Sequence, residues 1–209
     1  MSEGIVLAGG TGSRLGLPYN KHKALVYDRQ MIEYPIATMK ELGVDKPVIV
    51  TNLSSVPLKG GYPHEIQEHP LGMPDAILAA ETRVKDNFYA IAGDVYLDPA
   101  PEPSDEPTLY WHESPDAINH SVWNPETNEV IEKPTRDIGC RAIIFYMFGQ
   151  EVFELIRTLK PSERGELEMT DIYKWYILNG VQMKEYKGFF ADMGTRDGLL
   201  KVANHVQAL

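Results

Sequence analysis

The sequence predicts an α/β protein, a three-layer α/β/α sandwich built on a mainly parallel but mixed sheet. Short apolar runs rich in β-branched residues alternate with longer amphipathic stretches. A glycine-rich segment directly follows the first apolar run, and the length of 209 residues with 43% hydrophobic side chains suits one domain. We therefore expect a single domain over residues 1–209 whose ligands lie beyond the carboxyl ends of the strands.

The individual elements follow from this alternation. In the first half of the chain, the pattern predicts strands at 5–7, 48–50 and 88–92 and helices at 31–42 and 76–84. Residues 99–107 contain four prolines, which neither a helix interior nor a central strand accommodates, so this segment is expected to be a surface loop. In the second half, strands are expected at 108–111, 129–131 and 143–146, and helices at 151–159, 169–178 and 196–206.

Composition restricts the class of protein. The formal net charge of −10 argues against a nucleic-acid-binding surface, on which lysine and arginine would cluster. The single cysteine, Cys140, forms no internal disulfide, and neither a leader nor an apolar run of membrane-spanning length is seen. We expect a cytoplasmic protein without a nucleic-acid or membrane partner, and a homo-oligomer is compatible with the sequence.

The glycine-rich segment is the strongest single signal for a ligand. Gly9, Gly10 and Gly12 allow sharp turns and let a phosphate approach the backbone N–H groups, and Arg14 adds a charge-assisted contact. A dinucleotide-binding loop would have a third glycine where Leu15 stands, and the Gly-Lys-Ser/Thr ending of a Walker loop is missing. A simple tight turn is the remaining alternative. The nucleotide-binding residues expected here are Leu7, Ala8, Gly9, Gly10, Thr11, Gly12 and Arg14.

Lysines follow this loop. Lys23 precedes the apolar run 24–27, so it could stand at the mouth of a strand and hold a phosphate. The alternative is a solvated lysine in a turn that also contains Lys21.

Two aspartates follow apolar segments. Asp94 ends the strand-like run 90–92, and Asp192 stands between an apolar piece and a turn. Two carboxylates suit Mg²⁺, which takes its remaining ligands from water and substrate phosphates. Either aspartate alone is also a common helix cap or turn former.

Glu132 and Lys133 end another strand-like run and pair a hydroxyl acceptor with a cation. The alternative is a surface ion pair. The six histidines have no metal-ligand spacing, and no serine stands in a nucleophile elbow.

Taken together and in order, these segments resemble the sugar-1-phosphate nucleotidylyltransferases, and among them most closely the glucose-1-phosphate thymidylyltransferases. The resemblance runs almost end to end and is carried by residues 7–15, the run from Lys23 to Pro35, Gly93-Asp94, Glu132-Lys133-Pro134, residues 164–172 and residues 192–195. It implies a Rossmann-like nucleotidyltransferase fold with Mg²⁺ as cofactor. It also implies transfer of a nucleoside monophosphate to a sugar 1-phosphate or related small phosphate, with release of pyrophosphate.

The resemblance also implies a role for each matching residue. Arg14 would neutralise the triphosphate and Lys23 would contact phosphate near the reacting centre, while Asp94 and Asp192 would hold Mg²⁺. Lys133 would bind the acceptor phosphate, with Glu132 on a sugar hydroxyl. Gln67 and Gly72 keep the spacing with which the family reads a pyrimidine, so dTTP, CTP and UTP are the expected donors.

Several positions depart from the family pattern. Residues 73–76 read Met-Pro-Asp-Ala where the family has Leu-Ala-Gln-Ala, which leaves the base open. In the acceptor pocket, Ser121 replaces a glycine, Arg141-Ala142 stands for Thr-Gly, and Phe190 replaces a tryptophan. These changes favour an acceptor that is smaller than glucose 1-phosphate or negatively charged.

The remaining expectations concern regulation and alternatives. The chain stops soon after residues 196–206, where the family continues into a regulatory segment, so feedback control of that type is expected to be absent. A catalytically silent nucleotide-binding homologue is the main alternative function. An NAD-dependent oxidoreductase is remote because of the broken glycine pattern.

Overall fold

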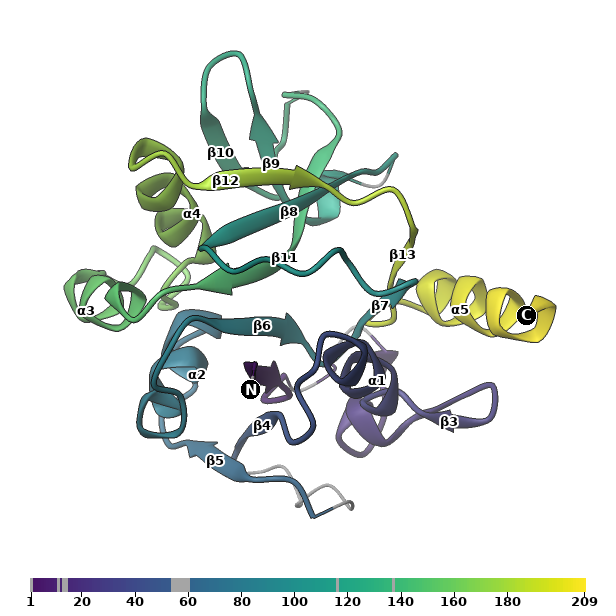
Figure 1. The fold of residues 1–209 in the computed structure, drawn as a ribbon. Helices are drawn as coiled ribbons and strands as arrows, with labels where there is room; N and C mark the ends of the chain where they lie inside the picture. Colours follow the sequence, from purple (N-terminus) through teal and green to yellow (C-terminus); the bar gives the residue numbers. More distant parts are fainter. Residues whose placement is uncertain (1, 11, 13–14, 54–60, 116, 137) are drawn as a thin grey trace.

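A computed structural model describes residues 2–10, 12, 15–53, 61–115, 117–136 and 138–209. In this part of the chain, a nine-stranded sheet has the order β10-β9-β11-β6-β1-β4-β5, and β8 pairs with β11 and β12 (Figure 1). Its strands are β1 (Glu3–Leu7), β4 (Val48–Asn52), β5 (His64–Gln67), β6 (Phe88–Ala92), β8 (Thr108–Glu113), β9 (Ser121–Asn124), β10 (Glu129–Glu132), β11 (Arg141–Phe148) and β12 (Gln182–Glu185).

The half of the sheet around β1 is parallel. Strand β1 lies between β6 and β4, and β5 continues the parallel set beyond β4. Ile5 and Leu7 pack into one hydrophobic cluster, while Val6 and Ala8 pack into another on the opposite face. A strand buried on both faces needs a continuous apolar run, which is why the run 5–7 predicts a strand correctly.

The other half is largely antiparallel. Strand β11 pairs in antiparallel fashion with β6, β8 and β9, and only β12 lies parallel to β8. The β11–β8 register shifts between Ile143 and Phe145, as at a β-bulge. The predicted mixed sheet is therefore confirmed.

Helices cover both faces of the sheet. On one face lie α2 (Met73–Ala79), α3 (Glu151–Thr158) and α4 (Met169–Leu178), whose buried residues share a cluster with Ile5 and Leu7 (Figure 1). On the other face lies α1 (Glu33–Glu41), which packs Ile36 and Met39 against the cluster of Val6. The three-layer prediction is confirmed, and α5 (Arg196–Ala208) packs beside the sheet against a separate ribbon.

That ribbon was not predicted. It consists of β7 (Val95–Asp98) and β13 (Phe189–Asp192), which pair in antiparallel fashion outside the main sheet. In a small hairpin, β2 (Leu25–Val26) falls within the apolar run 24–27, where a strand was considered, whereas its partner β3 (Arg29–Gln30) was missed, since a two-residue strand leaves no periodic pattern. The predicted helix 76–84 begins earlier, at Met73, and ends at Ala79, followed by a 3₁₀ turn at Glu81–Arg83. The proline-rich segment 99–107 contains neither helix nor strand, as expected.

None of the helices in the described ranges combines the length and the apolar character needed to cross a membrane.

Candidate active site

A cavity of about 240 Å³ opens where β1 and β6 end. Leu7 and Ala92 are the last residues of these strands, and the Gly93 N–H donates to the Leu7 carbonyl (2.8 Å), which joins the two ends. The lining residues come from all parts of the chain: Leu7, Gly10, Lys21, His22, Met73, Ala92, Asp94, Val95, Asn119, His120, Ser121, Glu132, Lys133, Ile143, Ile144, Tyr146, Tyr173, Phe190 and Asp192. This is the edge at which an α/β sheet binds ligands.

The two predicted metal-binding aspartates lie side by side because of the β7–β13 ribbon. Asp192 is paired with Val95, the residue after Asp94, and the Met193 N–H donates to the Asp94 carbonyl (2.7 Å). The Asp192 carboxylate accepts a hydrogen bond from the Gly194 N–H (2.7 Å). Both residues therefore line the same cavity, Asp94 from the turn before β7 and Asp192 from the end of β13.

Of the two lysines that follow the glycine loop, Lys21 lines this cavity and Lys23 does not. Its Nζ donates to Asp94 Oδ2 in an ion pair whose side chains are only 10% and 13% exposed. The Lys21 side chain crosses the glycine loop so closely that a Cβ on Gly12 would lie 2.7 Å from Lys21 Cβ. Gly12 also has a φ of +72°, so both backbone conformation and space require glycine there.

Burial and charge act in opposite directions on Asp94. Burial alone would raise the pKa of its carboxyl group, but the neighbouring Lys21 ammonium, His22 and hydrogen bonds together lower the pKa of Asp94 below its ordinary value. The carboxylate is thus held ionised, ready to interact with a cation.

His22 lines the cavity next to this ion pair. Its ring is buried, and its Nδ1–H donates to Asn20 Oδ1 (2.8 Å), which also accepts from the His22 backbone N–H (3.0 Å). Burial lowers the pKa of His22 to about 4, although Asp94 opposes this shift. Gly93 leaves room for the ring, because a Cβ there would lie 2.7 Å from His22 Cδ2.

The neutral, buried ring of His22 should make folding stability depend on pH. Its pKa is about 4 in the folded protein, against an ordinary value of 6.5, so the unfolded chain binds more protons between these two pH values. Stability should therefore be lost as the pH falls through this window, by up to about 3 kcal/mol. Urea unfolding of wild type and His22→Gln, measured with a chelator across this range, should show a shallower pH dependence for the variant. His69→Gln, at an exposed position, should follow wild type; parallel curves for wild type and His22→Gln would contradict the assignment.

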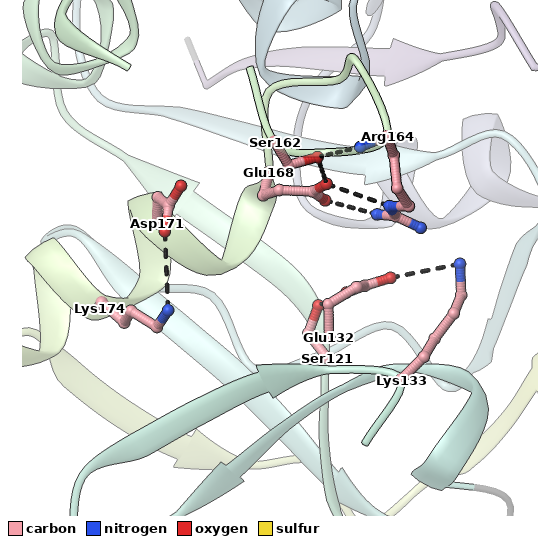
Figure 2. A network of polar contacts seen from close by, with 8 residues as sticks. All are labelled: Ser121, Glu132, Lys133, Ser162, Arg164, Glu168, Asp171 and Lys174. Carbon is pink, nitrogen blue, oxygen red and sulfur yellow. Dashed lines mark hydrogen bonds and ion pairs between the residues drawn. The ribbon is translucent and has the colours of Figure 1, made fainter. Parts of the chain in front are cut away.

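The opposite wall carries the predicted acceptor residues. Glu132 pairs with Ser121 across β10 and β9, and Ser121 Oγ donates to Glu132 Oε2 (Figure 2). Lys133 Nζ lies 3.4 Å from Glu132 Oε1, and the Lys133 backbone has a φ of +45°, unusual for a lysine. The Lys133 N–H donates to the His120 carbonyl (2.9 Å), which fixes this turn.

A second cation near this wall, Arg164, was given no role from the sequence. Figure 2 shows the Arg164 guanidinium facing the same gap as the Lys133 ammonium. Two hydrogen bonds to Glu168, of 2.6 and 3.2 Å, hold the Arg164 guanidinium in place, and Ser162 Oγ also donates to Glu168 (2.6 Å). Burial would raise the pKa of Glu168, but the Arg164 and Ser162 bonds lower it, so its carboxylate stays charged.

The predicted base-reading residues lie next to the glycine loop but do not line the cavity. Gln67 ends β5 and is 4% exposed, with its Oε1 packed against Gly9. Its Nε2 donates to the Gly72 carbonyl (2.9 Å) and to Asp75 Oδ2 (2.7 Å). Gly72 has a φ of +102°, and a Cβ there would lie 2.5 Å from the Leu167 carbonyl. The loop that carries Arg164 is thus packed onto the Gln67 side of the site.

The structure brings together most of the predicted site residues. Among those named from the sequence, the cavity is lined by Leu7, Gly10, Asp94, Ser121, Glu132, Lys133, Phe190 and Asp192. Ala8, Gly9, Gly12, Gln67 and Gly72 lie nearby without lining it, and Thr11 and Arg14 are outside the described residues.

Two further residues predicted for the site, Lys23 and Arg141, also do not line the cavity. Lys23 is in the same 3₁₀ turn as Lys21 but does not line it. Arg141 lies at the start of β11, where its guanidinium packs over the rings of Trp111 (4.9 Å) and Trp123 (5.9 Å). The β11 positions that line the cavity are Ile143, Ile144 and Tyr146, so the acceptor contact expected for Arg141 has no support from this geometry and stays a prediction.

Comparisons with known proteins agree with this geometry. Residues 4–101 match the family model of the MobA-like NTP transferase domain, and residues 119–208 match that of the nucleotidyl transferases. Glucose-1-phosphate thymidylyltransferase of Neisseria meningitidis is 28% identical, with 99% of this chain and 83% of that protein covered.

Solved structures show the same fold. A candidate glucose-1-phosphate thymidylyltransferase from Bacillus anthracis, solved with sucrose, superposes with a TM-score of 0.86 at 27% identity and covers 100% of this chain and 96% of that one. The UDP-glucose pyrophosphorylase of Acinetobacter baumannii has the same fold, with a TM-score of 0.80 at 19% identity over 98% and 93% of the two chains. The chain therefore carries nucleotidyl transferase family-model domains over most of its length, and its relatives along the whole chain are sugar-1-phosphate nucleotidylyltransferases.

Proposed function

We propose that this protein transfers a nucleoside monophosphate from a pyrimidine nucleoside triphosphate to a small phosphorylated acceptor. The observation that carries the proposal is the convergence of Asp94, Asp192 and Lys21 on one wall of a cavity that has Glu132 and Lys133 on the other. Such a site provides opposite places for two phosphorylated substrates. The proposed reaction needs no protein nucleophile, because it depends on positioning and charge.

The triphosphate belongs on the glycine-loop side. Gly10 and Lys21 both line the cavity. Because Gly9 and Gly12 have no side chain, neighbouring residues lie close to the loop backbone. The Lys21 ammonium forms an ion pair with Asp94, and the lysine side chain is long and flexible enough to turn toward a phosphate. Arg14 is proposed to add charge to this side, as expected from the sequence.

The donor set fits Mg²⁺. Asp94 and Asp192 supply two carboxylates, and no cluster of three or more His, Cys, Asp or Glu ligands exists among the described residues. Magnesium is usually held by one or two carboxylates together with water and substrate phosphates, unlike zinc in its closed sites. When bound there, Mg²⁺ would neutralise phosphate charge and help to orient the triphosphate.

The acceptor belongs on the Lys133 side. Lys133 and Arg164 are proposed to hold its phosphate, and Glu132 to accept hydrogen bonds from its hydroxyl groups. An oxygen of this phosphate would attack the α-phosphorus of the triphosphate. The bond from the α-phosphorus to the bridging oxygen would break, and pyrophosphate would leave with that electron pair. The attacking phosphate is ionised at neutral pH, so no catalytic base is needed.

Bulky apolar walls favour a small acceptor. Ile143, Ile144 and Phe190 line the cavity, and the Phe190 ring packs against His112 and His120, each with a centroid distance of 5.4 Å. Arg141, the cation that favoured an extra negative charge, packs over Trp111 and Trp123 and does not line this cavity. We therefore propose an acceptor smaller than glucose 1-phosphate.

A screen of pyrophosphate release tests the proposal. CTP, UTP and dTTP are each combined with glucose 1-phosphate, pentose phosphates, glycerol phosphate and other small phosphate esters in the presence of Mg²⁺. We expect turnover, with at least about a tenfold higher kcat/KM for an acceptor smaller than a hexose phosphate. Glucose 1-phosphate reacting as well as any other acceptor would contradict the size argument. Nucleotide binding without pyrophosphate release across the panel would instead support a silent homologue.

A further inference from the structure

A second cavity, of about 200 Å³, adjoins the one described above. Its walls come from β8, the 3₁₀ turn Ala117–Asn119, the end of β13 and the first turns of α5. The two cavities share four lining residues: Asn119, His120, Phe190 and Asp192. A ligand that fills the first cavity therefore has the second one next to it.

The Phe190 ring lies at the boundary between the two cavities. The rings of His112 and His120 pack against it, each with a centroid distance of 5.4 Å. A ring that packs against two others cannot turn aside without losing these contacts. An acceptor that extends past Phe190 must do so around a fixed ring, which suits a narrow chain better than a sugar ring.

The acceptor wall leads directly to this boundary. The Lys133 N–H donates to the carbonyl of His120 (2.9 Å), and the next residue, Ser121, donates to Glu132 (Figure 2). His120 itself lines both cavities. A phosphate held by Lys133 therefore places the rest of its acceptor beside the second cavity.

His112 offers a hydrogen-bonding group in the second cavity, which it lines without lining the first. Its Nδ1 lies 2.9 Å from the Tyr186 carbonyl, which can only accept, so Nδ1 carries a proton. Where the structure describes the chain, Nε2 has no hydrogen-bond partner. A hydroxyl group can donate to Nε2 of the neutral ring and accept from the protonated ring, so a hydroxyl matches His112 in both states.

The remaining polar groups also suit neutral hydroxyls. The amide of Asn119, likewise without a hydrogen-bond partner in the described ranges, supplies both a donor and an acceptor. Asp197 and Lys201, four residues apart on α5, bring opposite charges to the same cavity, and Asp192 adds a negative charge at the boundary. A second anionic group on the acceptor is therefore not favoured here.

We propose that the acceptor is an open-chain polyol phosphate whose far hydroxyl groups bind His112 and Asn119 in the second cavity, an inference that rests on the proposed function. The phosphate lies on Lys133, a nearby hydroxyl on Glu132, and the chain passes Phe190. A chain with a hydroxyl on each carbon satisfies the polar groups along this path, which a plain alkyl chain would leave unpaired. His112 thereby determines specificity for the length of the acceptor.

Polyol phosphates of different length test this assignment. Pyrophosphate release is measured with Mg²⁺ and each of CTP, UTP and dTTP, with glycerol 3-phosphate or the 5-phosphates of ribitol, arabinitol and xylitol as acceptor. The best five-carbon polyol should have at least about a tenfold higher kcat/KM than glycerol 3-phosphate, which is too short to reach the second cavity. Ribose 5-phosphate, which closes the same carbon skeleton into a ring, should react less well than ribitol 5-phosphate.

Variants of His112 separate the proposed hydrogen bond from packing. His112→Asn keeps a donor near the position of Nδ1, facing the Tyr186 carbonyl, but removes Nε2, so the ratio of five-carbon to three-carbon kcat/KM should fall about tenfold. His112→Gln returns a polar group near the position of Nε2 and should recover part of the ratio. His69→Asn makes the same change at an exposed position and should keep the wild-type ratio.

The outcomes distinguish this inference from the proposed function. Equal kcat/KM for both lengths, turnover of other acceptors without turnover of any polyol phosphate, or the wild-type ratio in His112→Asn would overturn the inference and leave nucleotidyl transfer standing. Absence of pyrophosphate release with every acceptor tested would contradict the proposed function and, with it, the inference.

Discussion

Replacing Asp94 by Asn should lower the rate of pyrophosphate release by at least about a hundredfold. Asp94 is the carboxylate that the cavity shares with Lys21 and Asp192, and its lowered pKa keeps it charged. The amide has nearly the same shape but lacks the charge that attracts a cation. The rate is measured at saturating acceptor over a range of Mg²⁺ concentrations.

The double variant Asp94→Asn/Lys21→Met separates activity from stability. Removing one partner of a buried ion pair costs about 3 to 5 kcal/mol, whereas removing both leaves no uncompensated charge. The double variant should therefore recover part of the stability lost in each single variant and still be inactive. Asp45→Asn, at an exposed position, controls for the substitution itself. Wild-type turnover by Asp94→Asn would refute the metal assignment.

Replacing Lys21 by Met should also reduce kcat/KM by at least about a hundredfold, whereas Lys23→Met should retain most of the activity. Lys21 forms an ion pair with Asp94 and lines the cavity. Lys23, two positions further in the same turn, does not line the cavity. Methionine preserves the length and packing of the side chain beside Gly12 while removing its charge. Steady-state kinetics of both variants with one nucleotide and one acceptor give the comparison.

The Lys21 and Lys23 variants form a matched pair, because their residue type and local helix are the same. Loss of activity in Lys23→Met with Lys21→Met unaffected would reverse the assignment and restore the expectation from the sequence. Lys21→Arg adds a charge test: partial activity is expected, since the guanidinium keeps the charge but is larger than the ammonium.

The architecture could be predicted because its signals are local. Short apolar runs marked β1, β4 and β6, and the predicted helix 169–178 coincides with α4. These strands are buried on both faces, so they differ clearly in composition from the helices between them. The β7–β13 ribbon escaped prediction because its two strands are far apart in the sequence and pair only in three dimensions.

Residues predicted for the site from their position at strand ends line the cavity more often than those predicted from turns. Four of these residues lie at or just after strand ends, whose positions the sheet fixes: Asp94, Glu132, Lys133 and Asp192. Lys21 could not be distinguished from Lys23, since successive residues of a 3₁₀ turn point in directions about 120° apart. Arg141 stands two residues before Ile143, the first position of β11 that lines the cavity. No local signal in the sequence marks where that strand passes the cavity.

The β7–β13 pairing also determines when the protein can become competent during synthesis. Asp94 leaves the ribosome directly after β6, but Asp192 arrives much later, with β13. A nascent chain that has completed the parallel sheet therefore lacks half of its carboxylate pair. The proposed chemistry must therefore wait until β13 has paired with β7, so a chain interrupted before β13 would have the glycine loop and Lys21 without the second proposed carboxylate.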